Sequence, residues 1–416
     1  MNMRKLKVSL ACLLSLFTIA FISCKDDDNG GTNLVEDGVY VVGAGTPLTS
    51  LSTKGLMATG VNEVGQAPRD GMYEIYMTVL AGADGFNIVE KAGSIETTYG
   101  PDAVSSVVMD GTNDQPKDVT IQKGTFKETT DKFTVPADGL YHIVIDMNTG
   151  TVAIVPIDHW AVIGAATPLG WGGETVLPLK GTFNFASNVV EFEGTNLKMD
   201  KGEYKFRYDN GWKVELSGDS VKFNTNLGGE SLTALTPGGA NINFAGTDRG
   251  YYTIKMKWSL TSGLVVTLSK TGSITPTDYT NIHFGIIGNC YYKPDGTTQA
   301  SWDINWGATS LLNHADSLAH TIAPVVTNTT TYTWTWDHVG IVTPATPTDD
   351  MVFKIRQDAN WSGKSIGYGA LTMAGAAASN FSNKDGNIKC STTGDYKFIL
   401  VIDATTENYT FTVTKY

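Results

Sequence analysis

The sequence predicts an all-β protein built from three tandem immunoglobulin-like β-sandwich domains that follow a signal peptide. Glycine accounts for 45 of the 416 residues and aromatic residues for 10%, whereas charged residues account for only 17%, a composition typical of strands and turns. Short segments that alternate apolar and polar residues are interrupted by Gly, Asn and Asp, as expected for antiparallel strands. Several motifs also recur along the chain and divide it into comparable units.

The N-terminus has the features of a lipoprotein signal peptide. Basic residues precede an apolar stretch over residues 8–23, which is too short to span a membrane. A small residue then precedes Cys24, an arrangement that resembles a bacterial lipoprotein cleavage site. We therefore expect residues 1–23 to be removed and Cys24 to carry the lipid, with residues 24–36 as an acidic, lipid-anchored tether. Ordinary signal cleavage beside an incidental cysteine is the alternative.

Charge and cysteine content exclude several classes of function. The formal net charge is −12 and no basic stripe is visible, so nucleic acid is not an expected partner. No spacing of Cys, His or acidic residues fits a metal centre, and no phosphate-binding loop is present, so neither metal nor cofactor is expected. Outside the cytoplasm a disulfide between Cys290 and Cys390 is permitted, and two free thiols are the alternative.

Two motifs define the repeat. The first, Gly-Ala-x-Thr-Pro-Leu after a short apolar run, occurs at residues 43–48 and 164–169, with a weaker copy at residues 284–288. The second, G-x-Y-x-[IF], occurs at residues 139–143, 250–254 and 394–398. They predict three β-sandwiches, named here the first segment (residues 37–157), the second segment (residues 158–272) and the third segment (residues 275–416).

A third motif, K-[FI]-R-x-D-x-x-W, occurs once in the second segment and once in the third. Because side chains alternate along a strand, Lys205 and Arg207 are expected on one exposed face, with the apolar residue between them in the core. Trp212 follows in a turn. The corresponding residues of the third segment are Lys354, Arg356 and Trp361.

Cations beside a tryptophan suit a sugar site. Lys and Arg donate hydrogen bonds to hydroxyl groups, and an indole face covers the apolar C–H face of a pyranose. Three further tryptophans lie in Gly-rich or polar turns and are expected to extend these surfaces: Trp171, Trp302 and Trp306. A structural role is the alternative, in which the arginines pair with nearby acidic residues and the turn tryptophan covers the core.

Other aromatic residues are expected in the core. They are Trp160 and Trp258, and the alternating set Tyr332, Trp334 and Trp336. The first segment contains no tryptophan, and its counterpart of the K-[FI]-R motif, residues 85–90, contains no cation. We therefore expect the first segment to be a spacer without a binding site.

Together, the lipoprotein signal, the acidic tether and the repeated motifs resemble the SusE/SusF family, the starch-binding outer-membrane lipoproteins of starch-utilisation systems. The resemblance covers nearly the whole mature chain and is strongest over residues 158–272. It implies a non-binding N-terminal sandwich followed by two carbohydrate-binding sandwiches. The binding residues that it implies are Trp171, Lys205, Arg207 and Trp212 in the second segment, and Trp302, Trp306, Lys354, Arg356 and Trp361 in the third. A longer insertion before Lys354 departs from the pattern.

The same resemblance implies a location and a role. The protein would be anchored in the outer membrane through lipid on Cys24, would face the extracellular side, and would hold starch or another α-glucan for outer-membrane glycan-uptake proteins. A polysaccharide other than starch, a protein-binding adhesin and a glycoside hydrolase are the alternatives. A hydrolase needs two carboxylates that flank a cleft, and no catalytic motif is recognisable, so no catalytic residue is assigned and the protein is not expected to be an enzyme.

Overall fold

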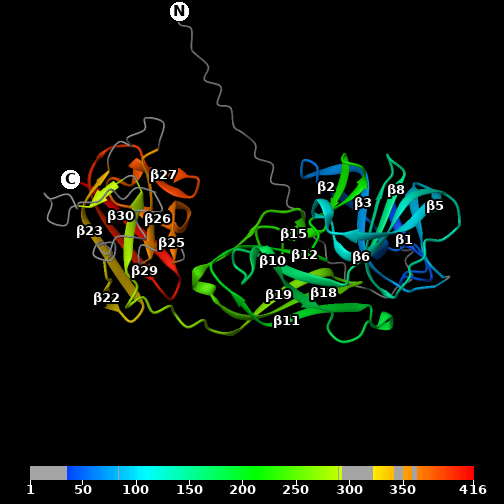
Figure 1. Ribbon diagram of the computed structural model, residues 1–416. Helices are drawn as coiled ribbons and strands as arrows, with labels where there is room; N and C mark the ends of the chain where they lie inside the picture. Colours follow the sequence, from blue (N-terminus) through cyan, green and yellow to red (C-terminus); the bar gives the residue numbers. More distant parts are fainter. Residues whose placement is uncertain (1–34, 83, 289, 293–321, 342–349, 358–362) are drawn as a thin grey trace, which may run out of the picture. The chain divides into compact units, whose positions relative to one another are not determined.

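The computed structural model describes residues 35–82, 84–288, 290–292, 322–341, 350–357 and 363–416. These residues form β-strands joined by turns and by one-turn 3₁₀ helices, which confirms the all-β class (Figure 1). The 3₁₀ helices are η1 (Thr53–Gly55), η2 (Thr112–Asp114), η3 (Phe185–Ser187), η4 (Gly246–Asp248), η6 (Tyr368–Ala370) and η7 (Ala378–Asn380). Within these described ranges, no helix is both long and apolar enough to cross a membrane.

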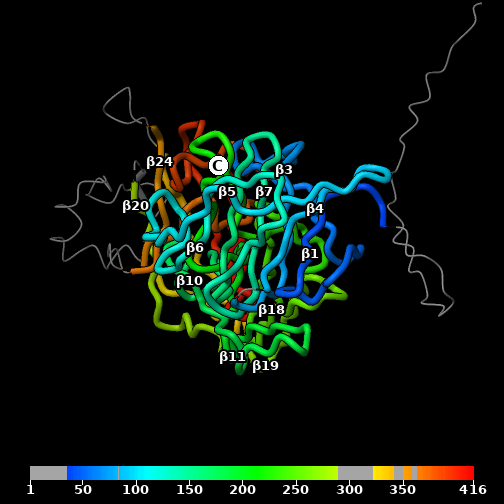
Figure 2. Tube along the Cα trace, turned by 90° about the vertical axis from the view of Figure 1, so that its right-hand side faces the viewer, coloured from blue at the N-terminus to red at the C-terminus, as the bar shows by residue number. Residues whose placement is uncertain are grey.

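The strands of the first segment belong to one continuous antiparallel sheet, which can be followed in Figure 2. They are β1 (Gly38–Val42), β2 (Ala58–Asn62), β3 (Ala67–Val79), β4 (Asn87–Ala92), β5 (Ile95–Asp110), β6 (Lys117–Glu128), β7 (Gly139–Asp146) and β8 (Thr151–Pro156). Their order in space is β1-β4-β5-β6-β8-β7-β3-β2, and the sheet continues from β2 into two strands of the second segment, β14 and β13.

The second segment contributes two further sheets. Its strands are β9 (His159–Gly164), β10 (Gly170–Pro178), β11 (Val189–Met199), β12 (Gly202–Tyr208), β13 (Lys213–Ser217), β14 (Val221–Asn224), β15 (Asn226–Gly228), β16 (Thr236–Pro237), β17 (Ile242–Phe244), β18 (Gly250–Ser259) and β19 (Gly263–Gly272). One sheet has the order β10-β9-β12-β15-β16, with β17 also paired to β12, and the other has the order β11-β18-β19.

The third segment also forms two sheets. Its strands are β20 (Phe284–Gly288), β21 (Cys290–Tyr292), β22 (Val325–Asn328), β23 (Thr331–Ile341), β24 (Val352–Gln357), β25 (Ser365–Ile366), β26 (Leu371–Ala374), β27 (Phe381–Lys384), β28 (Asn387–Cys390), β29 (Gly394–Asp403) and β30 (Asn408–Lys415). The orders are β20-β24-β28-β27, with β25 on β24, and β21-β23-β29-β30-β26, with β22 on β23.

The hydrophobic core is not divided in the way that the repeats suggest. One cluster of buried residues runs through the first and second segments, and another belongs to the third. At the junction of the first two segments, the indole of Trp258 donates to the carbonyl of Tyr76 at 3.0 Å, and His142 lies between Tyr208 and Glu74. The boundary predicted between residues 157 and 158 is therefore not a boundary between two separate cores.

The G-x-Y-x-[IF] motif forms the same structure in every segment. The hydroxyl groups of Tyr141, Tyr252 and Tyr396 each donate to the carbonyl four residues earlier in the chain, and all three rings are buried. This arrangement is the tyrosine corner found in Greek-key sandwiches, where it closes the turn before a central strand. The repeat of this motif is therefore explained by folding rather than by binding.

The Gly-Ala-x-Thr-Pro-Leu motif is likewise a structural turn. The hydroxyl groups of Thr46 and Thr167 donate to the carbonyls of Gly43 and Gly164, each at 2.9 Å. Gly164 has a φ of 143°, and a Cβ at that position would lie 2.2 Å from the carbonyl oxygen of Glu203. Only glycine allows the neighbouring strand to approach so closely.

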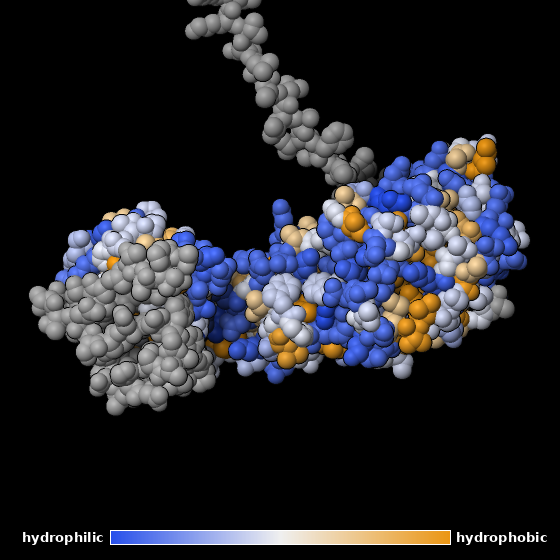
Figure 3. Space-filling view, turned by 45° about the horizontal axis from the view of Figure 1, so that its top comes forward, coloured by the Kyte–Doolittle hydropathy of each residue, from blue (hydrophilic) through white to orange (hydrophobic). Residues whose placement is uncertain are grey.

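All five of the predicted core aromatics are confirmed. Trp160, Trp258, Tyr332, Trp334 and Trp336 are all buried. Exposed apolar side chains are few, and the face drawn in Figure 3 is mainly hydrophilic with small hydrophobic patches. Because isolated apolar side chains are common on protein surfaces, an exposed tryptophan is the more informative observation.

Candidate functional site

Two of the predicted tryptophans come together in the second segment. Trp171 lies near the start of β10 and is 42% exposed, and Trp212 lies in the turn that follows β12. Their ring centroids are 6.3 Å apart and the ring planes are inclined by 36°. Leu169, two residues before Trp171, is also exposed. We call Trp171 and Trp212 the tryptophan platform.

Strand β12 presents the two predicted cations on one face. Phe206, between them, is fully buried, as the alternation along a strand predicts. Lys205 pairs across the ladder with Ile163 and Arg207 with Ala161, both on β9. The same-face prediction is therefore confirmed for the second segment.

The predicted exposure of Arg207 is wrong. Arg207 is only 8% exposed, and its Nε donates to Oε2 of Glu174 on β10 at 2.9 Å. Its Cζ lies 5.0 Å from the ring centroid of Trp212. A guanidinium is weakly hydrated and planar, so it can be buried against an indole while it pairs with a carboxylate. Arg207 therefore has the structural role that the sequence left as an alternative, and it supports the platform tryptophan.

An acidic and imidazole cluster extends from Arg207, and sequence patterns did not identify it. Nε2 of His159 lies 2.7 Å from Oε1 of Glu174, and Nδ1 of His159 lies 3.2 Å from Oδ1 of Asp209. Burial raises the pKa of Asp209 to about 7, although the charge of His159 opposes this. The hydrogen bond to Glu174 raises the pKa of His159. The one signal in the sequence that could have identified this cluster was the aspartate of the K-[FI]-R-x-D-x-x-W motif, which is Asp209.

Lys205 is the more accessible cation of the site. It is half-buried, and burial lowers its pKa. Its Nζ donates to Oδ1 of Asn226 on β15 at 3.3 Å, and Nδ2 of the same Asn226 donates to the carbonyl of Trp212 at 2.9 Å. Asn226 therefore links the lysine to the backbone of the platform. An ammonium group has three donors, so Lys205 retains capacity for a ligand hydroxyl.

The third segment reproduces the framework of this site. On β24, Lys354 pairs with Ile287 and Arg356 with Gly285 of β20, which matches the register of the cations in the second segment. Ile355 is fully buried and Arg356 is buried, so the alternation is confirmed and the exposure of Arg356 is again wrong. Three predicted residues lie outside the described residues: Trp302, Trp306 and Trp361.

The first segment has the same strand pair without the cations. In the β1–β4 ladder, Val42 pairs with Asn87 and Tyr40 pairs with Val89. Asn87 and Val89 therefore occupy the places that Lys205 and Arg207 occupy on β12. The Nδ2 of Asn87 donates to the backbone carbonyls of Tyr99 and Asp131, so this side chain serves the fold.

Cys390 is a free, buried thiol. Its Sγ lies 3.1 Å from the carbonyl of Thr392 and 3.7 Å from the hydroxyl of Tyr396. The side chain of Cys290 lies outside the described residues. The disulfide that the sequence permits is therefore not formed at Cys390 in this structure, where the thiol packs beside the tyrosine corner.

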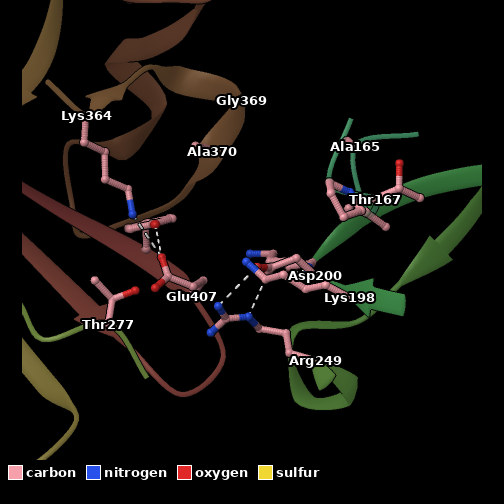
Figure 4. A pocket seen from close by; sticks show the side chains of 15 residues that line it. Ala165, Thr167, Lys198, Asp200, Arg249, Thr277, Lys364, Gly369, Ala370 and Glu407 are labelled. Atoms are coloured by element: carbon pink, nitrogen blue, oxygen red, sulfur yellow. Dashed lines mark hydrogen bonds and ion pairs between the residues drawn. The ribbon is translucent and has the colours of Figure 1, made fainter. Parts of the chain in front are cut away.

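A cavity of about 730 Å³ is a second place where charged side chains gather (Figure 4). Arg249 pairs with Asp200 and also donates to the carbonyls of Ala404 and Thr405, at 3.0 and 3.1 Å. Lys364 pairs with Glu407 at 3.0 Å. Burial favours a raised pKa for Glu407, but the hydrogen bond from Tyr409 and the charge of Lys364 outweigh it and lower the pKa. These four charged side chains are thus paired within the protein, and the tryptophan platform is the stronger candidate site.

Fold and site together define an all-β protein with a partly exposed aromatic platform beside a cation-bearing strand. No protein-family model matches the chain, and no curated protein matches it. Among solved structures, the chain is similar to SusF from Bacteroides thetaiotaomicron, with 13% sequence identity and a TM-score of 0.21, over 92% of this chain and 73% of that one. A similarity of this size does not indicate a shared function.

Proposed function

We propose that the protein binds polysaccharide on the tryptophan platform of the second segment. The observation that carries this proposal is the pair formed by exposed Trp171 and half-buried Trp212, with 6.3 Å between ring centroids. An aromatic face removes a large apolar area of a sugar from water at a small cost in side-chain entropy. Two such faces at this spacing can contact neighbouring sugars of one chain, with Lys205 donating to their hydroxyl groups.

Starch or another α-glucan is the ligand that we propose first. The two rings are inclined by 36° rather than coplanar. Inclined rings match a chain that turns from one sugar to the next, as a helical α-glucan does, better than a flat ribbon. The resemblance of the sequence motifs to the SusE/SusF family points to the same ligand, and another curved polysaccharide is the alternative.

The carboxylates beside the platform favour binding over hydrolysis. Glu174 accepts from Arg207 and contacts His159. Asp209 accepts the backbone amides of Asp158 and His159, at 3.3 and 3.1 Å, and is 1% exposed. A glycosidase needs its two carboxyl groups free to reach the scissile bond from opposite sides. These two side chains are instead committed to internal partners, so we propose a binding protein.

The cellular role follows from the N-terminal motif. Lipid on Cys24 would anchor the chain in the outer membrane, and residues 24–36 would act as an acidic tether toward the extracellular side. The protein would then hold polysaccharide at the cell surface for outer-membrane uptake proteins. A second platform, built from Lys354, Arg356 and the third segment's turn tryptophans, would raise the effective concentration of sites on a polymer.

The binding proposal is tested by affinity electrophoresis of the full chain in gels that contain starch, xylan, levan or mannan. We expect retardation in starch for wild type and weaker retardation for the Trp171→Ala/Trp212→Ala variant. Each ring that is lost removes about 1.5–3 kcal/mol of binding free energy, because the apolar surface of the sugar is no longer buried against it. Further replacement of Trp302, Trp306 and Trp361 with Ala should abolish retardation.

The matched control is Trp258→Phe, which alters a buried tryptophan outside the platform and should leave retardation unchanged. Circular dichroism verifies that each variant is folded. A folded five-tryptophan variant that is retarded like wild type would place binding elsewhere. Release of reducing sugar from the gel polysaccharide would instead establish a hydrolase.

The anchoring proposal is tested by Cys24→Ala. Because the lipid is the proposed membrane attachment, this variant should leave the membrane fraction, whereas Cys12→Ala, within the signal peptide, should not. Cell fractionation and added protease measure both outcomes. A Cys24→Ala protein that stays in the outer membrane would contradict lipid anchoring.

A further inference from the structure

The platform tryptophan Trp212 is held partly by the first segment. Strands β5 and β6 form a long hairpin, and residues 111–116 form its tip. The tip contains Asn113 and Asp114 with φ values of 56° and 62°. Asn and Asp tolerate this left-handed region better than other non-glycine residues. The tip therefore has a defined, tightly turned backbone, and it lies against the turn at residues 209–212.

Backbone hydrogen bonds join the hairpin to the turn that carries Trp212. The amide of Trp212 donates to the carbonyl of Asp114 at 2.7 Å, and the amide of Lys117 donates to the carbonyl of Asp209 at 2.9 Å. The amide of Glu215 donates to Oε1 of Gln115 at 3.2 Å. The turn is thus bonded to the first segment before, at and after Trp212.

The second segment satisfies the other backbone group of Trp212. Its carbonyl accepts the amide of Thr225 at 3.1 Å and Nδ2 of Asn226 at 2.9 Å. Both backbone polar groups of Trp212 are therefore fixed, the donor by the first segment and the acceptor by the second. The backbone that carries the indole is therefore held in place before a ligand arrives.

Side-chain packing at the same contact is tight. A Cβ added to Gly211 would lie 2.8 Å from Cγ and Cδ of Pro116. The φ of Gly211 is not positive, so its backbone does not itself require glycine. The contact with Pro116 is the reason that no side chain fits at residue 211.

We infer that the β5–β6 hairpin tip is a positioning element of the binding site, so that the first segment is part of that site rather than a spacer. This inference rests on the proposed function of the platform. Its physical basis is preorganisation: ordering a loop on binding costs affinity, and a loop that is already held avoids this cost.

Gly211→Ala tests the inference in the full chain. The variants carry Trp302→Ala, Trp306→Ala and Trp361→Ala as background, so that only the second segment's platform is measured. The new methyl group should push the hairpin tip away from Trp212. The double variant Gly211→Ala/Pro116→Ala removes the two ring atoms that lie 2.8 Å from the added methyl group. The backbone nitrogen of residue 116 stays 2.9 Å from it, so the double variant should restore part of the contact. Gly369→Ala is the matched control, because no atom lies within 4 Å of its added Cβ.

Hydrogen exchange measures the contact without any ligand. The amide of Trp212 should exchange faster in Gly211→Ala than in the background, and Gly369→Ala should leave it unchanged. Calorimetry with a maltooligosaccharide should then give about tenfold weaker binding for Gly211→Ala, which corresponds to about 1.4 kcal/mol. The double variant should recover part of this loss, and circular dichroism verifies that each variant is folded.

The outcomes separate this inference from the proposed function. Unchanged exchange in Gly211→Ala, or faster exchange with unchanged affinity, overturns the positioning role. A background protein that binds no saccharide overturns the proposed function, and the positioning of a binding site falls with it. Faster exchange, weaker binding and recovery in the double variant together support the inference.

Discussion

The first and second segments contain the same strand pair in the same register, but they present different chemistry on its outer face. In the β1–β4 pair the outward positions hold Asn87 and Val89, whereas in the β9–β12 pair they hold Lys205 and Arg207. The inner positions of both pairs are apolar and buried. The two segments therefore share their apolar inner positions and differ in the residues on the other face of the strand.

This difference separates the motif that folding explains from the motif for which we propose a role in binding. The tyrosine corner occurs in all three segments, because each must close the same kind of turn. The K-[FI]-R-x-D-x-x-W motif is absent from the segment without a platform. The first segment still contributes to the site, through the backbone of its hairpin rather than through an outer face of its own.

The largest expected loss of stability comes from replacing a cation of β12 with an apolar residue, as the first segment has at the equivalent position. Arg207→Met removes the guanidinium that pairs with buried Glu174 and should cost about 3 kcal/mol of unfolding free energy. Adding Glu174→Gln removes the unpaired carboxylate and should recover much of that loss. Urea unfolding measures both. If the Arg207→Met variant is as stable as the double variant, that result would contradict a buried ion pair between Arg207 and Glu174.

A smaller effect is expected at the junction of the two segments. Nδ1 of His142 lies 2.9 Å from the hydroxyl of Tyr208, and both residues are fully buried. Tyr208→Phe leaves this nitrogen without its partner and should cost about 1–3 kcal/mol. Because the first and second segments share a core, calorimetry should show one common transition for them, which Tyr208→Phe lowers.

The third segment provides the control for this experiment. Its core is a separate cluster, so we expect it to unfold in a transition of its own. Tyr396→Phe, at the tyrosine corner of that segment, should lower only this second transition. Separate transitions for the first and second segments would contradict a shared core.

The smallest expected effect is a pH dependence of the unfolding free energy that arises in the second segment. Burial raises the pKa of Asp209 to about 7, and the bond to Glu174 raises the pKa of His159. Both groups thus hold a proton more tightly in the folded than in the unfolded chain. Their contribution to stability is present at acidic pH and is lost as pH rises, for Asp209 between about 4 and about 7.

We expect most of this loss to occur between pH 5 and pH 7, below the raised pKa of Asp209 and above the ordinary pKa of an aspartate. Asp209→Asn cannot titrate and should remove it, so the difference in urea midpoint between wild type and variant should change with pH. Asn87→Ala provides the comparison in the first segment, because neither Asn nor Ala titrates and the difference from wild type should not change with pH. A pH-independent difference between wild type and Asp209→Asn would contradict the raised pKa.

Much of the fold was accessible from patterns that depend only on neighbouring residues. Alternation placed Phe206 and Ile355 in the core between two cations, and it placed Trp334 and Trp336 on a buried face. Patterns did not reveal that Arg207 is buried. Its partner Glu174 lies on another strand, in an irregular part of the β9–β10 ladder, where no spacing rule predicts the register.

The sequence alone determined the all-β class, the repeated turns and the residue types of the platform, because alternation, turn residues and side-chain chemistry are local properties. Tertiary structure decided which residues meet. It joined Trp171 to Trp212, buried Arg207 beneath the platform, and brought Asp114 of the first segment to the backbone of Trp212. Such contacts depend on how strands that are distant in sequence pair and twist. No local pattern of residues reveals them.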